Sequence, residues 1–169
     1  KEIDISSALK LLFDTCFDLV DYSSPTAKRE RLGQYFELVS HEINPTKLSI
    51  DLKNIQLDLQ EKSKWLIEHL QKNEWIETKR GSWFNGYYDN LGKRVEGDFP
   101  EGIKMTLTGQ VFPIMAGVAS DDQIREIIKA ADKFLFDIKV GGYRLNTKFE
   151  APQMEMGRAF GFAYGTKEN

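Results

Sequence analysis

The sequence has one cysteine, no long apolar run and little net charge. Cys16 has no partner for an internal disulfide bond, so a reducing, cytoplasmic compartment is the expected location. No run approaches the roughly 20 apolar residues of a membrane-spanning helix, so no membrane partner is expected. The net charge is −3, whereas general binders of nucleic acid or anionic membranes carry a basic surface. We therefore expect a soluble protein that does not bind nucleic acid.

The common signatures of metal and nucleophilic catalysis are also missing. His41 and His69 are far apart, and neither has a second ligand at helical or turn spacing, which argues against a metal site. No Ser-His-Asp or Cys-His pattern stands out, and Cys16 falls in an apolar helical pattern that predicts an inert, buried thiol. The glycines near Gly157 and Gly161 match neither a P-loop nor a dinucleotide-binding spacing. We therefore expect no metal and no organic cofactor.

The composition is that of a globular protein of ordinary size. Apolar residues make up 41% and charged residues 29% of the 169 residues, which suffices for a real core. The N-terminal KEIDISSALKLL enters a helical pattern at once and does not resemble a signal peptide. The C-terminal FAYGTKEN stops in a polar turn. Both ends predict a piece of a longer chain.

Apolar residues recur mostly at intervals of three and four, which predicts a largely helical protein. The predicted helices are Ile5–Tyr22, Lys28–Ile43, Leu52–Asn73 and Thr106–Val118, with a short extended connector over Thr46–Ile50. The helix from Leu52 is expected to bury one face. That face carries Ile55, Leu59, Leu66, Ile67 and Leu70.

One further helix has the clearest start signal in the chain. Ser120 with Gln123 three residues later is a capping-box pattern, and acidic residues fill the first turn. An amphipathic pattern follows as far as Leu135. Gly141–Gly142 ends the pattern, and Tyr143–Asn146 reads as a short strand.

The stretch GSWFNGYYDNLGKRVEG, residues 81 to 97, interrupts the helical pattern with aromatic and amide side chains, and it predicts a β-hairpin or an ordered loop. Sugars are bound by flat aromatic faces together with amides, carboxylates and guanidinium groups that pair with hydroxyls. An alternative interpretation places the aromatic rings in the core and gives the Asp-Asn pair a turn role only. Side chains that would suit a sugar site are Trp83, Asn85, Tyr87, Tyr88, Asp89, Arg144, Asn146, Lys167 and Glu168.

Cleavage of a glycosidic bond needs a carboxylic acid that protonates the leaving oxygen. If phosphate is the nucleophile, no catalytic base is needed, because the anion is already able to attack. Asp89, Asp98 and Glu168 lie in suitable loops, but the pattern alone does not select one of them.

Four motifs, in this order, resemble the catalytic domain of glycoside hydrolase family 94: WFNGYYDNLGKRVEGDFPEG, MTLTGQVFPIMAGVAS, GGYRLNTKF and GRAFGFAYGTKEN. The likeness is greatest to 1,2-β-oligoglucan phosphorylases and to the phosphorylase-like part of cyclic β-1,2-glucan synthases, and the sequence does not separate the two. The resemblance is strong over Trp65–Asn169.

The resemblance implies a mainly α fold that is part of an (α/α)6 barrel with small β-hairpin or extended loops. Residues 1–169 would form a single segment of that larger domain, helical over 1–75 and with helices and sugar-site loops over 76–169. It also implies inverting phosphorolysis of β-1,2-linked glucooligosaccharides to α-glucose 1-phosphate, with inorganic phosphate as co-substrate. The family's acid, an Asp in a D-W-N-D type motif, has no counterpart here and would lie upstream of Lys1. We therefore assign no catalytic residue to this chain and expect the isolated segment to be inactive.

The resemblance carries seven residues over as substrate-binding candidates. Lys167 and Glu168 match a turn that faces the acceptor sugar in the family. Phe162 departs from the Tyr of cellobiose-acting members, which makes cellobiose a less expected substrate. For the other five candidates the role is either sugar contact or support of the pocket: Trp83, Tyr88, Asp89, Gln110 and Arg144.

The expected partners are a β-1,2-glucooligosaccharide, phosphate and the remainder of the same catalytic domain. The alternative from a different class is a non-catalytic helical module that binds carbohydrate or protein.

Overall fold

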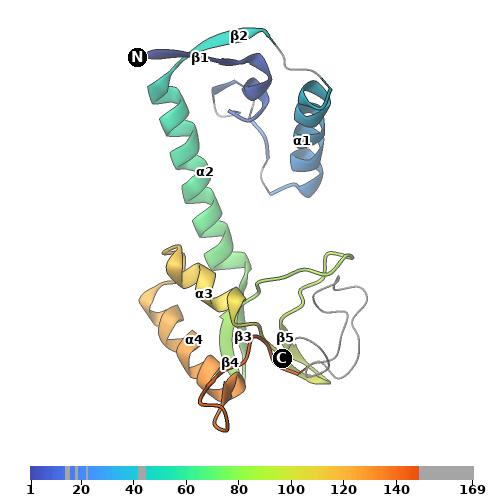
Figure 1. The fold of residues 1–169 in the computed structure, drawn as a ribbon, viewed down its shortest axis with the longest axis vertical. Coiled ribbons are helices and arrows are strands. Elements are labelled where there is room, and N and C mark those ends of the chain that lie inside the picture. Colours follow the sequence, from blue (N-terminus) through green and yellow to red (C-terminus); the bar gives the residue numbers. More distant parts are fainter. Residues whose placement is uncertain (14–15, 18, 22, 42–44, 149–169) are drawn as a thin grey trace. The chain divides into compact units, whose positions relative to one another are not determined.

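The computed structural model describes residues 1–13, 16–17, 19–21, 23–41 and 45–148. The chain forms two compact units, residues 1–66 (unit 1) and residues 67–169 (unit 2). The described part contains four α-helices, one short 3-10 helix and four two-stranded antiparallel sheets (Figure 1). The expected helices with small β-hairpins are confirmed, but the fold is mixed rather than mainly α.

Unit 1 begins with a strand, and the predicted helix from Ile5 is wrong. Strand β1 (Glu2–Ser6) pairs antiparallel with β2 (Lys47–Asp51), so that Ile3 lies opposite Ile50. The sequence EIDIS alternates apolar and polar residues, and pairing with a distant strand overrides the local helical spacing. The predicted extended connector over Thr46–Ile50 corresponds to β2. The 3-10 helix η1 (Ser7–Leu11) follows β1, and Cys16 beyond it is only half-buried.

Helix α1 (Pro25–Val39) begins earlier than predicted. Ser24 caps it, its Oγ accepting a hydrogen bond from Ala27 N at 3.2 Å, and Pro25 occupies the first turn, where its missing N–H costs nothing. None of its residues is buried. Ile43, the predicted end, lies outside the described residues.

Helix α2 (Leu52–Asn73) has the predicted bounds but not the predicted buried face. Leu59 and Leu66 are more than half exposed, and Asp58 is the one described side chain of this helix that is fully buried. The Asp58 carboxylate pairs with the Lys62 ammonium, which also bonds the carbonyl of Leu12. A buried charge needs such a partner.

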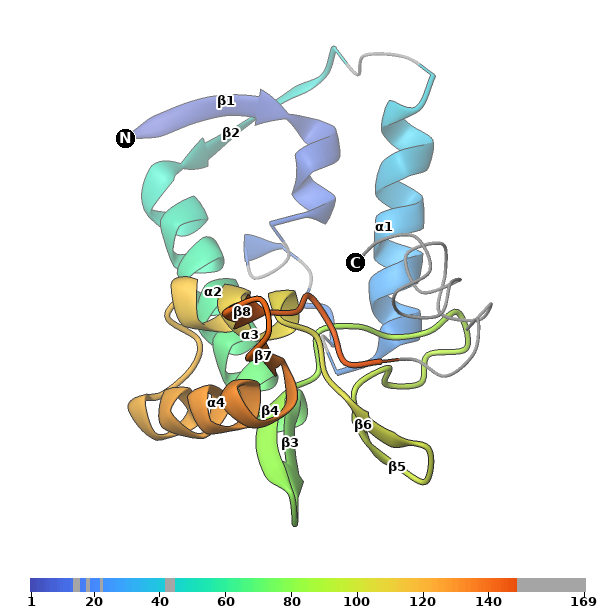
Figure 2. The ribbon, with the colours of Figure 1, turned by 60° about the horizontal axis from the view of Figure 1, so that its bottom comes forward.

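Unit 2 is built around a β-hairpin covered by a helix. Strand β3 (Trp75–Thr78) pairs with β4 (Gly81–Phe84), and α4 (Asp121–Phe134) packs against β4 (Figure 2). The predicted capping box is confirmed, with Ser120 and Gln123 bonding each other's backbone N–H. The main apolar cluster consists of Ile76, Trp83, Met105, Ala130, Ala131 and Leu135.

The remaining elements of unit 2 are short. Strands β5 (Gly97–Phe99) and β6 (Gly102–Lys104) form a second hairpin, and β7 (Phe136–Asp137) pairs with β8 (Gly142–Tyr143). The strand predicted over Tyr143–Asn146 is therefore partly confirmed, because Asn146 also forms an isolated bridge with Thr106.

Helix α3 (Thr108–Met115) is shorter than the predicted Thr106–Val118. Its end coincides with Gly117, whose φ of +67° favours glycine. Val118 leaves the helix and packs with Phe84 and Ile127 in a second apolar cluster.

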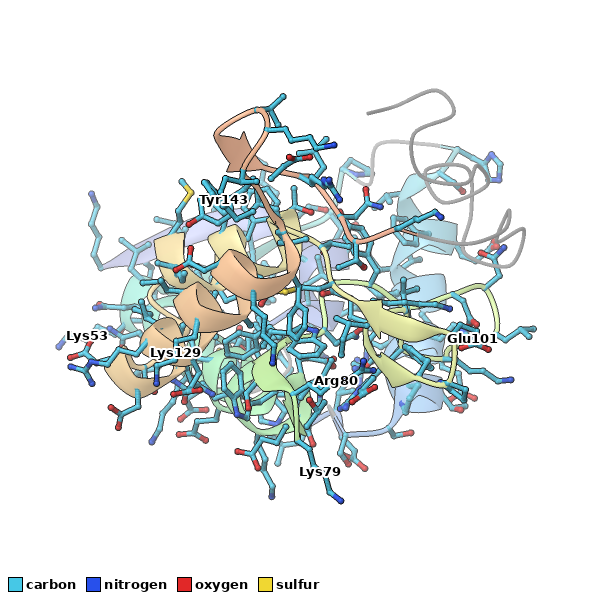
Figure 3. All side chains as sticks on the ribbon, turned by 90° about the horizontal axis from the view of Figure 1, so that it is seen from below. Lys53, Lys79, Arg80, Glu101, Lys129 and Tyr143 are labelled. Carbon is cyan, nitrogen blue, oxygen red and sulfur yellow. The ribbon has the colours of Figure 1, made fainter. Side chains whose placement is uncertain are left out.

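Arg80 connects the β3–β4 and β5–β6 hairpins of unit 2. Lys79 and Arg80 lie at the turn between β3 and β4, and Glu101 lies at the turn between β5 and β6 (Figure 3). The Arg80 Nε donates to Asp98 Oδ2 at 2.9 Å, and this ion pair lowers the pKa of Asp98.

In the ranges that the structure describes, no helix combines the length and apolar content needed to cross a bilayer.

Candidate functional site

A cavity of about 380 Å³ lies in unit 2 where three segments meet: the end of α2, the residues after β4, and α3. We refer to it as the Tyr87–Phe112 cavity. Its lining residues are Leu70, Glu74, Phe84, Asn85, Gly86, Tyr87, Thr108, Gly109, Phe112 and Pro113.

Aromatic rings lie at the accessible side of this cavity. Phe112 is 64% exposed and Tyr87 is 37% exposed, so both rings have surface available to a ligand. The Tyr87 hydroxyl lies 3.1 Å from Thr108 Oγ1, which links the segment after β4 to the first turn of α3. Accessible rings beside hydroxyl groups suit a ligand with one apolar face and several hydroxyls.

Glu74 supplies a carboxylate to the lining of the cavity. The residue is 8% exposed, and its carboxylate accepts hydrogen bonds from Asn85 Nδ2 at 3.0 Å and from the Tyr88 hydroxyl at 2.7 and 2.8 Å. The Arg94 guanidinium approaches to 3.9 Å. Burial, followed by the bond to Glu74, raises the pKa of Tyr88. An ionised carboxylate has about four acceptor positions, so Glu74 retains capacity for a ligand hydroxyl.

Asn85 joins Glu74 to a second buried carboxylate, Glu96. Its side-chain amide donates to Glu74, and its Oδ1 accepts a hydrogen bond from the backbone N–H of Glu96 at 3.3 Å. Its own N–H donates to the Glu74 carbonyl at 2.7 Å. These three bonds fix the chain as it leaves β4.

Glu96 lies behind the cavity and is 2% exposed. Its carboxylate accepts from the N–H groups of Gly86 and Thr106, each at 2.9 Å, from Thr106 Oγ1 at 2.7 Å and from Gln110 Nε2 at 3.1 Å. Burial raises the pKa of Glu96 to about 7, although the bonds from Thr106 and Gly86 act to lower it. A carboxyl group that titrates near neutral pH therefore supports the cavity.

Two glycines allow the walls of the cavity to meet. A Cβ on Gly86 would lie 2.6 Å from Gly109 Cα, and a Cβ on Gly109 would lie 2.6 Å from Glu96 Oε1. Both distances are far below van der Waals contact. Any side chain at either position would push the segment after β4 away from α3.

Trp83 does not line the cavity. It is fully buried in the main apolar cluster, and its ring makes an edge contact with Phe134 at 5.8 Å between ring centroids. Its indole Nε1 has no hydrogen-bond partner within the described ranges. This placement favours the core interpretation of Trp83 over a sugar-stacking surface.

Gln110 supports the pocket from within. It is 1% exposed, its Oε1 accepts from Phe84 N at 2.8 Å, and its Nε2 donates to the Phe84 carbonyl at 2.9 Å. The Gln110 amide thus bonds both backbone groups of Phe84 in β4, as a neighbouring strand would. It also donates to Glu96. The structure favours the supporting role for Gln110.

Tyr88 and Asp89 hold the aromatic turn in place. Tyr88 is 50% exposed and reaches the cavity through its bond to Glu74. The Asp89 carboxylate accepts the N–H groups of Leu91 at 2.9 Å and Lys93 at 2.8 Å, and Gly92 adopts a φ of +76°. Asp89 therefore anchors a turn, as one of the two sequence interpretations proposed.

The remaining candidates lie elsewhere. Arg144 donates from Nε to Asp137 Oδ2 at 3.1 Å within the β7–β8 hairpin and does not line the cavity. Lys167 and Glu168 lie outside the described residues. Asp98 has its carboxylate paired with Arg80, and a lowered pKa does not suit a proton donor.

Sequence reasoning missed Glu74, Glu96, Thr108 and Phe112. A carboxylate placed between Val95 and Gly97 was the available signal for Glu96. Among the described residues, no three His, Cys, Asp or Glu side chains are grouped so that they could hold a metal ion.

The comparisons with known proteins point to one family. The family model described as "Glycosyl hydrolase 94 superfamily, catalytic domain" matches residues 46–169, a range that contains the whole Tyr87–Phe112 cavity. No curated protein matches the chain. Since the match covers well over half of the sequence, the chain belongs to the glycosyl hydrolase 94 superfamily.

Proposed function

We propose that this chain is part of the catalytic domain of an inverting glycoside phosphorylase that acts on β-1,2-linked glucooligosaccharides and yields α-glucose 1-phosphate. Membership of the superfamily indicates a glycoside phosphorylase-type function. The β-1,2 linkage rests on the four sequence motifs. We also propose that the complete domain is an (α/α)6 barrel, that it works in the cytoplasm, and that it uses phosphate and no cofactor.

The observation that carries the proposal is the Tyr87–Phe112 cavity, to which we assign a glucosyl unit. Exposed aromatic rings offer surface for the C–H face of a sugar ring, and Glu74 and Thr108 offer acceptors and donors for its hydroxyls. Asn85 has both ends of its amide bonded within the protein, so it orients Glu74 rather than the sugar. The site binds substrate and does not cleave it.

In the proposed reaction, a phosphate oxygen forms a bond to the anomeric carbon as the glycosidic C–O bond breaks on the opposite face. A protonated carboxyl group gives its proton to the leaving oxygen, and no base is needed. None of the described carboxylates around the cavity is placed as this acid, because Glu74 accepts hydrogen bonds from Asn85 and Tyr88 and pairs with Arg94, and Glu96 is enclosed. We assign the acid to a D-W-N-D type motif outside this sequence, and the acceptor sugar to Lys167 and Glu168.

The test is phosphate-dependent release of glucose 1-phosphate from β-1,2-linked glucooligosaccharides. The complete protein should release it, whereas the 169-residue chain alone should not, because a general acid contributes on the order of 10² to 10⁴ in rate. Reactions without phosphate serve as the control. Release by the chain alone would show that the acid lies within it, and no release by the complete protein would refute the phosphorylase assignment.

A further inference from the structure

The carboxylate of Glu96 joins the two walls of the Tyr87–Phe112 cavity. Oε1 accepts from Gly86 N and Thr106 Oγ1, and Oε2 accepts from Thr106 N and Gln110 Nε2. Gly86 directly precedes Tyr87 in one wall. Thr106 and Gln110 lie on either side of Thr108 and Gly109 in the other wall.

Four hydrogen bonds from the two walls meet at this one carboxylate. The backbones of Gly86 and Gly109 are in close contact, and the Glu96 carboxylate and the Thr106 hydroxyl lie at this junction. Each oxygen already accepts two hydrogen bonds. A proton on Oε2 would face the N–H donors of Thr106 and Gln110, so one of these bonds would be lost. A proton on Oε1 would require the Thr106 hydroxyl to change from donor to acceptor.

We propose that Glu96 is a positioning residue whose ionised form holds the cavity walls in the arrangement that binds a sugar, and whose protonated form releases them. The proposal rests on the proposed function only in naming the ligand as a sugar. Glu96 does not touch the ligand, since its carboxylate is covered by Gly86 and Gly109.

Among residues 1–148 as far as they are described, no charged side chain bonds to Glu96 from an element packed against it. Its described partners are Asn85 and Gly86 from the segment after β4, Thr106, and Gln110 of α3. Glu74 and Arg94 lie beyond the Asn85 amide. Burial, and not a charged neighbour, is therefore what raises the pKa of Glu96.

Binding and stability should depend on pH in opposite directions. The raised pKa means that ionisation of Glu96 destabilises the fold, so stability falls as pH rises toward and through 7. Affinity should rise over the same range. A group with a pKa near 7 is ionised in about 90% of molecules at pH 8 and about 10% at pH 6, so affinity should be about tenfold weaker at pH 6. A residue that only stabilised the fold would make affinity follow stability.

The experiment measures binding of β-1,2-linked glucotriose to the complete protein by calorimetry between pH 6 and pH 8. Wild type should show the tenfold change, whereas Glu96→Gln should bind weakly and with no dependence on pH. Glu101→Gln, which alters an exposed carboxylate in the nearby β5–β6 turn, should behave as wild type. A wild-type affinity that is constant over this range would overturn the proposal.

Two Thr106 variants keep the test independent of how well Glu96→Gln folds. Thr106→Val removes one donor that lowers the pKa of Glu96, so the midpoint of the affinity profile should move to higher pH. Thr106→Ser keeps the hydroxyl and should restore the wild-type midpoint. A midpoint that stays unchanged in Thr106→Val would contradict the role of Glu96.

A measurement without ligand separates this proposal from the proposed function. In NMR spectra of the 169-residue chain, the amide signals of Gly86 and Thr106 and the ring signals of Tyr87 and Phe112 should titrate together near pH 7, and none should do so in Glu96→Gln. If glucotriose does not bind at any pH while these signals titrate, the sugar assignment fails and the positioning role stands. Ring signals that stay constant while the amides titrate would refute the positioning role.

Discussion

The two units of the chain differ in what they bury. In unit 1, the buried side chains that the structure describes are Ala8, Ile50 and Asp58, and Asp58 is paired with a lysine. Unit 2 has two apolar clusters and a network in which amides and hydroxyls surround Glu74 and Glu96. Burial of the apolar clusters offsets the cost of removing these polar groups from water. The surrounding packing also keeps each side chain of the network in a fixed position.

The cavities of the two units differ in the chemical groups that line them. Unit 1 has a hollow of about 230 Å³ formed by Leu11, Leu12, Val20 and Leu32, with Lys28, Arg31 and Lys62 also in its lining. The described part of its lining offers a sugar no aromatic face and no carboxylate or amide. The Tyr87–Phe112 cavity offers aromatic, hydroxyl and carboxylate groups, and the family match covers all of unit 2 but only the end of unit 1. The fixed polar groups of the Tyr87–Phe112 cavity therefore make it the better candidate for a sugar site.

The largest expected effect on stability comes from removing a buried ring of unit 2, compared with removing an exposed ring of unit 1. Trp83→Ala should lower the free energy of unfolding of unit 2 by about 3–5 kcal/mol, because it removes a fully buried ring. Phe36→Ala in unit 1 should change stability by less than about 0.5 kcal/mol, because that ring is 59% exposed. Amide hydrogen exchange read by mass spectrometry reports each unit separately. Equal effects would show that the exposed face of α1 contributes as much as the unit 2 core.

The next effect concerns the pH dependence of stability. With the pKa of Glu96 raised from 4.5 to about 7, wild-type unit 2 should lose about 3 kcal/mol between these pH values relative to Glu96→Gln. The sign follows from proton binding, because the folded state keeps the proton that the unfolded state has already released. Urea unfolding at a series of pH values measures the slope. Identical slopes in the two proteins would mean that Glu96 titrates normally.

A pair of glycine substitutions sharpens the comparison further. Gly109→Ala should destabilise unit 2 by about 1–3 kcal/mol, because the new methyl group meets Glu96 Oε1 and Thr106 Oγ1 at 2.6 and 2.7 Å. Gly33→Ala in α1 meets nothing within 4 Å and should stabilise the helix by about 0.5–1 kcal/mol. Thermal melting of the two variants checks the opposite signs. A shared sign would contradict the difference in packing.

The smallest effect compares two helix caps. Ser120→Ala removes one bond of a reciprocal capping box and should cost about 1 kcal/mol. Ser24→Ala removes a single cap bond, 3.2 Å long, from a helix that buries no side chain, and should cost about 0.5 kcal/mol. Urea denaturation with exchange detection distinguishes them. A larger loss for Ser24→Ala would show that α1 depends more on its cap than α4 does.

Local signals in the sequence predicted local structure well. The bounds of α2 and the capping box at Ser120 depend on neighbouring residues, and both are confirmed. The N-terminal strand was missed because its partner lies some forty residues away. Long-range pairing leaves little trace in a short window of sequence.

The candidate site was predicted in part. The stretch from Gly81 to Gly97 was predicted to be a β-hairpin or an ordered loop whose aromatic and amide side chains suit a sugar, and Tyr87 within it does line the cavity. The roles of Glu74 and Glu96 depend on groups brought together from three segments, which spacing alone does not reveal. Trp83 and Gln110 illustrate the converse, since their residue types suit a sugar and their positions are internal.

The contact between Gly86 and Gly109 has an evolutionary consequence. A substitution at either position would have to be accompanied by a shift of the opposing backbone or a smaller residue at position 96. Two compensating changes rarely arise together. The two glycines should therefore be inherited as a pair, and a relative that has lost one of them should have either a shifted backbone at this junction or a smaller residue in place of the buried carboxylate.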